Sequence, residues 1–230
     1  MYENQKFEKI QQALKFHEVR GKNIKFSTSR RPTIAKRDES SFCDGIVFSD
    51  RSILLYERVY IKILKLSSFW NGMIRFGFTT VDPNSLQTDF NNNQTNNLPK
   101  YVYPDLTNKE GYWAASLPDN SIKENDVIFY YVDAIGDVHY GLNDTYLGIF
   151  LSGVNTIKKT MQKTEALWAM IDIYGNTLSI ELFNSFENRN SLASDNYQLS
   201  SNYNMKSIGN ILRITKLLFI WYILKYYFIH

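Results

Sequence analysis

The sequence predicts an all-β protein whose core is an antiparallel β-sandwich. Short segments that alternate apolar and polar residues follow one another through the middle of the chain, and turn residues such as Gly136 and Gly175 separate them. No long amphipathic helix interrupts this pattern. With 230 residues, of which 44% are hydrophobic, the chain can bury a sizeable core. Many short strands joined by tight turns are typical of a β-sandwich.

The alternating segments fall into three groups of neighbours. We expect a hairpin of 59–64 with 73–78, a meander of 127–133, 137–142 and 146–151, and a hairpin of 167–174 with 177–182. Because successive side chains of a strand point to opposite faces, the alternation also predicts which residues point inward. The expected core residues are Ile61, Ile74, Phe76, Phe78, Ile128, Trp168 and Ile171.

The composition divides the chain into four parts. We expect an N-terminal extension over 1–15, the sandwich over 16–182, a disordered polar linker over 183–210 and an apolar, helix-like tail over 211–230. Inside the sandwich, residues 87–97 and 155–165 are polar and carry no periodicity. These two stretches are predicted to be loops or insertions.

The apolar tail has three interpretations. Residues 217–224 are wholly apolar, and only Arg213, Lys216 and Lys225 interrupt the run from 211 to 229. A membrane-spanning helix needs about 20 predominantly apolar residues, and cations near its ends can reach the interface. The tail is therefore a membrane anchor, a helix packed against the domain, or an unselected C-terminus.

Cysteine usage and the N-terminus both predict a cytoplasmic location. The single cysteine, Cys43, cannot form an internal disulfide, which fits a reducing compartment. The first residues, MYENQKFEKI, lack the apolar segment of a secretory signal peptide. Attachment to the surface of a membrane, or anchoring in it through the tail, is the alternative location.

The sequence contains no recognisable catalytic or metal-binding motif. Residues of the types that ligate zinc are His17, Cys43, His139 and His230. They lie far apart without paired spacing, so neither a zinc site nor a RING is expected. Asp133 and Asp137 flank a three-residue turn, where Asp is favoured because it bonds the backbone, so a calcium loop is not expected. We therefore expect no catalytic residue, no metal and no cofactor.

A basic run from residue 20 to residue 37 holds seven cations and no acid. In one interpretation it forms two solvated strands, because Ile24, Phe26 and Ile34 alternate with the cations. In the other it binds anionic membrane lipid through Lys22, Lys25, Arg30, Arg31, Lys36 and Arg37. A nucleic-acid partner is not expected, because the net charge is only +3 and no set of stacking aromatics accompanies the run.

Several runs of the chain form a recognisable series. They are FCDGIVFS at 42–49, WNGMIRFGFT at 70–79, GYWA at 111–114 and LWAMIDIYG at 167–175. In this order they resemble the Neuralized homology repeat, a domain related to the SPRY β-sandwiches. The resemblance extends over about residues 16–182 and implies an SPRY-like antiparallel fold.

The resemblance also implies a function, that of a protein-interaction module. In Neuralized-type ubiquitin ligases the repeat selects the substrate and a separate RING recruits the conjugating enzyme. In Notch signalling these ligases act on the cytoplasmic tails of Delta and Serrate ligands, promote their endocytosis and recognise peptides with paired asparagines. This chain has one repeat and no set of RING ligands. We therefore expect ligase activity only through a RING elsewhere in the gene product or in a partner.

The expected peptide site lies on strand-connecting loops, which carry binding in β-sandwiches. Its residues are Asp82, Asn84, Tyr112, Asp133, Trp70 and Trp113. A carboxylate accepts from the amide of a ligand asparagine, and an aromatic side chain supplies apolar area. The alternative for each aromatic residue is a loop ring tucked into the core.

Overall fold

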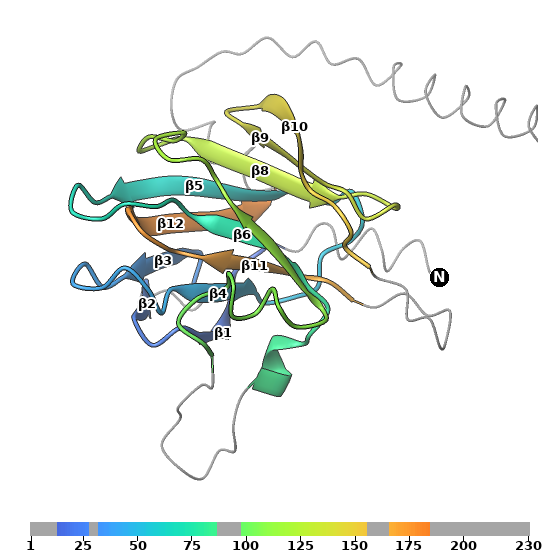
Figure 1. Cartoon of the computed structure of the whole chain (residues 1–230), viewed down its shortest axis with the longest axis horizontal. Helices are drawn as coiled ribbons and strands as arrows, with labels where there is room; N and C mark the ends of the chain where they lie inside the picture. The colour runs from blue at the N-terminus through green and yellow to red at the C-terminus, as the bar shows by residue number, and fades with distance from the viewer. Residues whose placement is uncertain (1–12, 28–31, 87–97, 156–165, 185–230) are drawn as a thin grey trace, which may run out of the picture. The chain divides into compact units, whose positions relative to one another are not determined.

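The computed structural model describes residues 13–27, 32–86, 98–155 and 166–184. In these ranges the chain forms twelve β-strands and a short 3₁₀ helix, η1 (Pro83–Leu86). The strands make two antiparallel sheets that pack face to face (Figure 1). The prediction of an all-β antiparallel sandwich is therefore confirmed. Within the described ranges, no helix has the length and apolar character needed to cross a bilayer.

The smaller sheet has five strands in the order β1-β4-β11-β6-β7. They are β1 (Phe16–Arg20), β4 (Ile46–Ser49), β11 (Trp168–Asp172), β6 (Arg75–Thr79) and β7 (Tyr112–Ser116). The central strand β11 places Ile171 beside Val47 of β4 on one side and beside Phe76 of β6 on the other. This apolar row across the sheet forms one wall of the core.

The larger sheet has seven strands in the order β10-β9-β8-β5-β12-β3-β2. They are β10 (Thr145–Leu151), β9 (Val138–Leu142), β8 (Val127–Val132), β5 (Val59–Leu66), β12 (Thr177–Asn184), β3 (Ile34–Arg37) and β2 (Ile24–Phe26). The expected three-stranded meander is confirmed, because β9 pairs with both β8 and β10. The interpretation of the basic run as two strands is also confirmed, since β2 pairs with β3.

Both expected hairpins are wrong, because each pair of segments is split between the two sheets. β5 pairs with β8 and β12, whereas β6 pairs with β7 and β11. β11 and β12 likewise belong to different sheets. The connections after β5 and after β11 cross the sandwich side by side, where Ser67 N–H donates to Asn176 O and Asn176 N–H donates to Gly72 O. Alternation with a short turn cannot distinguish such a crossing from a hairpin, because both need the same strand and turn residues.

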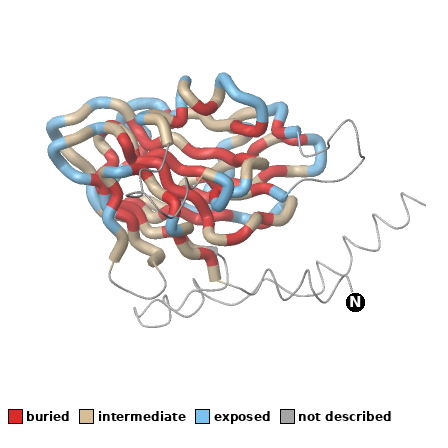
Figure 2. The backbone as a smooth tube through the Cα atoms, turned by 90° about the horizontal axis from the view of Figure 1, so that it is seen from below, coloured by how far each residue is buried: buried red, intermediate tan, exposed pale blue. Residues whose placement is uncertain are grey.

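The core lies between the two sheets, and the tube in Figure 2 shows burial running along the strands while exposure concentrates on their connections. Six of the seven expected core residues are fully buried, namely Ile61, Ile74, Phe76, Phe78, Ile128 and Ile171. The expectation for Trp168 is wrong, because its side chain is only half-buried. Positions 168 and 171 differ by an odd number, so on β11 they point to opposite faces.

The outer face of the five-stranded sheet is also covered, by a second apolar cluster. Its buried members are Val19, Ile46, Phe48, Val102, Leu106, Tyr112 and Met170. The segment 98–111 supplies two of them and lies over the sheet there. Both faces of β4 are therefore buried, which explains why its four residues are all apolar except Ser49.

Several expectations concern residues outside the described ranges. These are the N-terminal extension up to residue 12, the insertions 87–97 and 156–165, the end of the linker beyond 184 and the apolar tail. Arg30 and Arg31 of the basic run also lie outside the described residues.

Candidate functional site

Four aromatic side chains meet at the end of the sandwich where β5 finishes and β6 begins, the left-hand end in Figure 1. Phe42 lies 5.3 Å from Trp70, 6.4 Å from Tyr101 and 6.0 Å from Tyr174, measured between ring centroids. The rings of Tyr101 and Tyr174 are 6.0 Å apart and nearly perpendicular. Each ring comes from a different connecting loop. We call Phe42, Trp70, Tyr101 and Tyr174 the aromatic cluster, and its end of the sandwich the aromatic end.

Backbone hydrogen bonds between the loops hold the cluster together. Gly175 N–H donates to Phe42 O at 3.2 Å, and Asp44 N–H donates to Lys100 O at 2.9 Å. The loop between β5 and β6 also needs a glycine at position 72, which has a φ of +89°. A Cβ there would lie 2.6 Å from the ring of Tyr174. The close approach of backbone to ring therefore depends on a residue without a side chain.

A charged pair, Arg75 with the fully buried Asp172, lies beneath the rings. The guanidinium of Arg75 stacks on Tyr174 at 3.5 Å and lies 5.9 Å from the ring centroid of Tyr101. It is 3.6 Å from Asp172 Oδ2, which also accepts the Val102 N–H at 3.1 Å. Burial raises the pKa of Asp172 to about 6, although Val102, Arg75 and Arg37 act in the opposite direction. The pair ties β6 and β11 to the loop that carries Tyr101.

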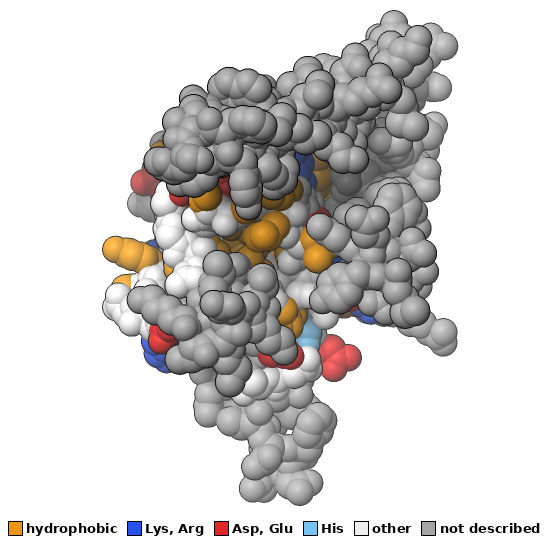
Figure 3. Space-filling model, turned by 90° about the vertical axis from the view of Figure 1, so that its right-hand side faces the viewer, with side chains coloured by type: hydrophobic (Ala, Val, Ile, Leu, Met, Phe, Trp, Pro, Cys, Tyr) orange, Lys and Arg blue, Asp and Glu red, His pale blue; other side chains and the backbone are white. Residues whose placement is uncertain are grey.

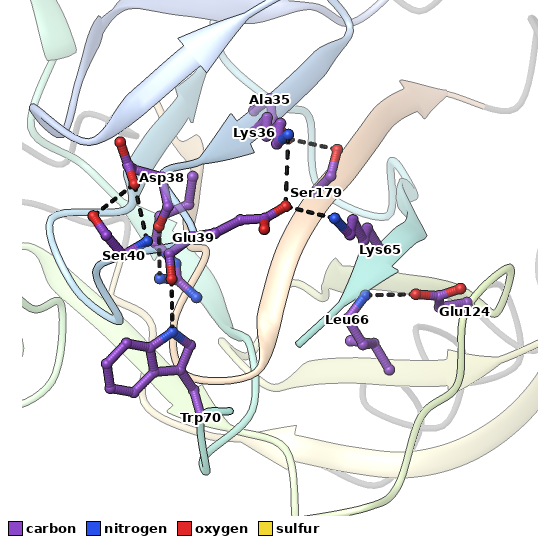
Figure 4. Close-up of polar contacts among 11 residues, drawn as sticks. Ala35, Lys36, Asp38, Glu39, Ser40, Lys65, Leu66, Trp70, Glu124 and Ser179 are labelled. Atoms are coloured by element: carbon purple, nitrogen blue, oxygen red, sulfur yellow. Dashed lines mark hydrogen bonds and ion pairs between the residues drawn. The ribbon is translucent and has the colours of Figure 1, made fainter. Parts of the chain in front are cut away.

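Trp70 is fixed at the rim of the cluster by the loop after β3 (Figure 4). Its indole Nε1–H donates to Glu39 O at 3.0 Å, while the Glu39 carboxylate pairs with Lys36 and Lys65. The hydrogen bond from Lys65, followed by the charges of both lysines, lowers the pKa of Glu39. Close to the cluster along the chain, Phe69 and Tyr103 are 89% and 58% exposed. Exposed apolar side chains of this size on a rigid base are typical of binding surfaces.

Both the sequence and the fold of this chain are similar to those of known proteins. A sequence model of Neuralized proteins matches residues 16–184. The protein neuralized of Drosophila melanogaster is 42% identical over 172 residues, which are 75% of this chain. The chain belongs to the Neuralized family. The crystal structure of the Drosophila melanogaster neuralized NHR1 domain has 42% identity and a TM-score of 0.65, with 76% of this chain and 99% of that one covered.

The family likeness concerns one domain of longer proteins. The match spans 20% of the length of the Drosophila melanogaster protein neuralized. The human E3 ubiquitin-protein ligase NEURL3 is 34% identical over 179 residues, which are 77% of this chain and 62% of that protein. The described domain is thus a Neuralized homology repeat, a protein-interaction domain of a family that includes E3 ligases.

Of the six expected peptide-binding residues, only Trp70 lies in the aromatic cluster. Asp82 and Asn84 are exposed at the opposite end of the sandwich, where β6 finishes and η1 begins. Asp82 Oδ1 accepts from Asn84 N–H at 2.9 Å and from Asn84 Nδ2 at 3.0 Å. These two side chains bond each other and cap the turn.

Tyr112 and Trp113 lie on strand β7, so the expectation that they sit in turns or loops is wrong. Tyr112 is 8% exposed and packs in the second apolar cluster, and burial raises the pKa of its hydroxyl. Trp113 is half-buried, pairs with Phe78 of β6 and packs against the main core. The loop before β7 has Pro104 and Gly111, which is why the sequence reads as a turn there.

Asp133 is half-buried in the turn between β8 and β9. Its Oδ1 accepts the N–H groups of Ile135 and Asp137 at 3.0 and 2.9 Å, and its Oδ2 lies 3.1 Å from His139 Nε2. These bonds, with that of His139 first among them, lower the pKa of Asp133 in opposition to its desolvation. The expected turn is confirmed, and the carboxylate is already engaged within it.

The basic residues of the alternative lipid site do not form one exposed patch. Arg37 is fully buried and donates to the carbonyls of Gly175 and Thr177, so it cannot contact lipid. Lys25 and Lys36 are exposed neighbours across β2 and β3. Lys22 is exposed and lies 3.5 Å from Asp44 Oδ1. Three of the six expected lipid-binding cations therefore lie on the described surface.

Sequence reasoning missed most of the aromatic cluster, namely Phe42, Tyr101 and Tyr174, and the exposed Phe69 and Tyr103 beside it. A signal was present for four of them, since Phe42, Phe69, Tyr101 and Tyr103 stand in segments outside the expected strands, with a glycine or proline within three residues. A large ring in such a segment has no strand face to bury it. The convergence of four loops at one end depends on the strand order, which alternation does not reveal.

Proposed function

We propose that this chain is a substrate-recognition domain of a Neuralized-like ubiquitin ligase, which binds short cytoplasmic peptides at the aromatic end. The observation that carries the proposal is the convergence of rings from four loops on a base that backbone hydrogen bonds hold rigid. A surface that is preorganised in this way loses little conformational entropy on binding. More of the free energy of its apolar contacts therefore contributes to affinity. Aromatic anchors are also the commonest hot spots of protein interfaces.

The proposed ligand is a peptide with paired asparagines, such as a segment of a Delta-type or Serrate-type cytoplasmic tail. This choice rests on the membership of the family together with the resemblance described above. Recognition of such a tail would direct ubiquitination and endocytosis of the bound protein, with the catalytic RING supplied elsewhere in the gene product or by a partner. The proposed location is accordingly the cytoplasm.

Titration calorimetry with a paired-asparagine peptide and its double Asn→Ala variant tests the ligand. Each buried amide left without its partner costs about 1 to 3 kcal/mol, or roughly 5 to 150-fold in affinity. We therefore expect the variant peptide to bind far more weakly. Equal affinity for the two peptides would remove paired asparagines as the basis of recognition.

Two matched substitutions then test the position of the site. Trp70→Ala removes a cluster ring at the aromatic end, and we expect affinity to fall by about 30-fold or more, the scale of a 2 kcal/mol hot spot. Asp82→Ala removes an exposed side chain at the opposite end and is expected to change affinity by less than about threefold, because Asp82 is engaged by Asn84. The reverse ranking would move the site to the opposite end.

A second candidate, binding to an anionic membrane, is favoured by one observation, the exposed pair of Lys25 and Lys36 across β2 and β3. Flotation of the full chain with vesicles that contain phosphatidylserine tests it, with and without residues 211–230. Flotation that needs the tail alone indicates an anchor. Flotation that is lost in a Lys25→Glu, Lys36→Glu variant indicates the basic strands.

A further inference from the structure

Three side chains at the opposite end of the sandwich form a hydrogen-bonded relay that the proposed peptide site does not use. His139 of β9 lies between Asp133 and Tyr146, the second residue of β10. The distance from His139 Nε2 to Asp133 Oδ2 is 3.1 Å, and that from His139 Nδ1 to the Tyr146 hydroxyl is 2.8 Å. In the sequence His139 alternates with Val138 and Tyr140, which predicts only a sheet-face histidine, and nothing in the spacing links it to a residue seven positions later.

The surroundings fix the role of each atom in the relay. Asp133 is anchored by two backbone N–H donors from its own turn, so its carboxylate is held in place as an acceptor. A carboxylate that accepts from Nε2 leaves Nδ1 with a free lone pair, which then accepts from the tyrosine hydroxyl. The imidazole also stacks on Tyr131, with centroids 4.9 Å apart and planes only 12° from parallel. The histidine is therefore oriented as a base towards Tyr146.

Tyr146 is reachable from solvent. It lies on the edge strand of the seven-stranded sheet and is 53% exposed. Figure 3 views this end of the sandwich, where hydrophobic side chains are visible near the centre. A small electrophile can approach the hydroxyl without any rearrangement of the strands.

We propose that Tyr146 is a nucleophilic tyrosine, a site of covalent modification by activated acyl donors. In the step, the Tyr146 oxygen forms a bond to the acyl carbon while the phenolic proton passes to His139 Nδ1. The bond from the acyl carbon to its leaving group then breaks, and His139 returns the proton to that group. Asp133 stabilises the imidazolium that forms in between. A carboxylate, an imidazole base and a hydroxyl nucleophile, hydrogen-bonded in this order, form the catalytic triad of many unrelated proteins.

The experiment uses N-acetylimidazole on the full chain at pH 8, with the acetylated tyrosines located and timed by peptide mass spectrometry. Tyr103 is an internal control, because it is 58% exposed, similar to Tyr146, and has no histidine hydrogen-bonded to its hydroxyl among the described residues. General-base assistance contributes about 10²-fold or more in enclosed sites, and for this exposed site we expect Tyr146 to react on the order of 10-fold faster than Tyr103.

Two variants test whether Tyr146 reacts faster because His139 acts as a base or only because Tyr146 is exposed. His139→Gln keeps a hydrogen-bonding side chain but removes the base, so Tyr146 should slow to the rate of Tyr103. Asp133→Asn offers Nε2 a donor in place of an acceptor, which favours the tautomer with a proton on Nδ1 and should also remove the excess rate. A far-UV circular dichroism spectrum that matches the wild type shows that each variant is folded. Equal rates for Tyr146 and Tyr103 in the wild type, or an excess that survives His139→Gln, overturns the proposal.

Discussion

The two ends of the sandwich use their polar groups and their rings in different ways. At the aromatic end the loops bond each other through backbone groups, such as Gly175 with Phe42 and Asp44 with Lys100, and their side chains present rings. At the opposite end the polar side chains of Asp82 and Asp133 bond their own turns. The first arrangement leaves side chains available for a partner, and the second uses them to hold the chain.

The comparison shows that a polar residue in a loop is a weak indicator of binding. Asp and Asn are favoured in turns because they bond nearby backbone, and that same bond removes them from contact with a ligand. A large ring in a loop has no such local partner. In this domain the rings are therefore better candidates for the proposed peptide site than the carboxylates are.

The largest effect of a substitution on stability is expected in the core that both ends of the sandwich share. Phe76 is fully buried, stacks on Phe150 with ring centroids 4.3 Å apart and lies 4.7 Å from the tilted ring of Tyr130. Phe76→Ala should lower the free energy of unfolding by about 3 to 5 kcal/mol through lost burial and a cavity, as measured by urea denaturation. Phe69→Ala is the control, because a ring that is 89% exposed should contribute less than about 0.5 kcal/mol. Similar losses in the two variants would contradict the assignment of core and surface.

The fold could be predicted from the sequence because alternation reports which face of a strand is apolar. Phe76 and Phe78 are two residues apart on β6 and both are buried, as their spacing requires. The pairing of β5 and of β11 could not be predicted, because β5 and β6, and likewise β11 and β12, are adjacent in sequence yet belong to different sheets. The choice between a hairpin and a crossing is made by long-range packing, which leaves no mark on the local pattern.

The next prediction concerns Asp172, the buried carboxylate beneath the aromatic cluster. Its pKa is raised from an ordinary value of 3.8 to about 6, so the folded state takes up a proton at a higher pH than the unfolded state does. Above pH 6 the cost of the buried charge is fully present, and it is relieved as pH falls towards 4. This group alone should therefore make the fold more stable by on the order of 3 kcal/mol as pH falls through that range.

The substitution Asp172→Asn isolates this effect, because the amide does not titrate. Urea denaturation of both proteins at pH 7.5 and pH 5.0 measures it. The difference in stability between the wild type and the variant should shift in favour of the wild type at pH 5.0. A difference that is the same at both pH values would show that Asp172 titrates as an ordinary carboxyl group.

A pair of glycine substitutions measures the close packing at the aromatic end. Gly72 and Gly153 both have a φ of +89°, so alanine at either position should cost about 1 to 2 kcal/mol of backbone strain. A Cβ at position 72 would also meet the ring of Tyr174, whereas one at position 153 meets nothing within 4 Å. Gly72→Ala should therefore lower the free energy of unfolding by more than Gly153→Ala in urea denaturation, and it alone should weaken peptide binding. Equal effects would mean that Tyr174 moves away freely.

The candidate site could be predicted only in part, and the reason is visible in Trp70 and Asp133. Trp70 was identifiable because a large ring in a turn segment needs a partner that the local sequence does not supply. The engagement of Asp133 depends on His139 Nε2 and on two backbone N–H groups, whose positions follow from the three-dimensional turn. Which loops meet at one end is a property of the strand order, and no single segment contains it.

The smallest effect is expected from salt, and it distinguishes the aromatic end from the basic strands. A peptide held by Trp70 and its neighbouring rings is bound mainly by apolar contact. Raising the ionic strength from 0.1 M to 1 M shortens the Debye length from about 10 to 3 Å, but it should change the affinity for this peptide by less than about threefold. Lipid bound through Lys25 and Lys36 gains about 1 kcal/mol per cation from the surface potential, and this is lost at high salt. Calorimetry with the peptide and flotation with anionic vesicles, each at the two salt concentrations, measure both. Peptide binding that collapses with salt would show that the lysines, and not the rings, hold the ligand.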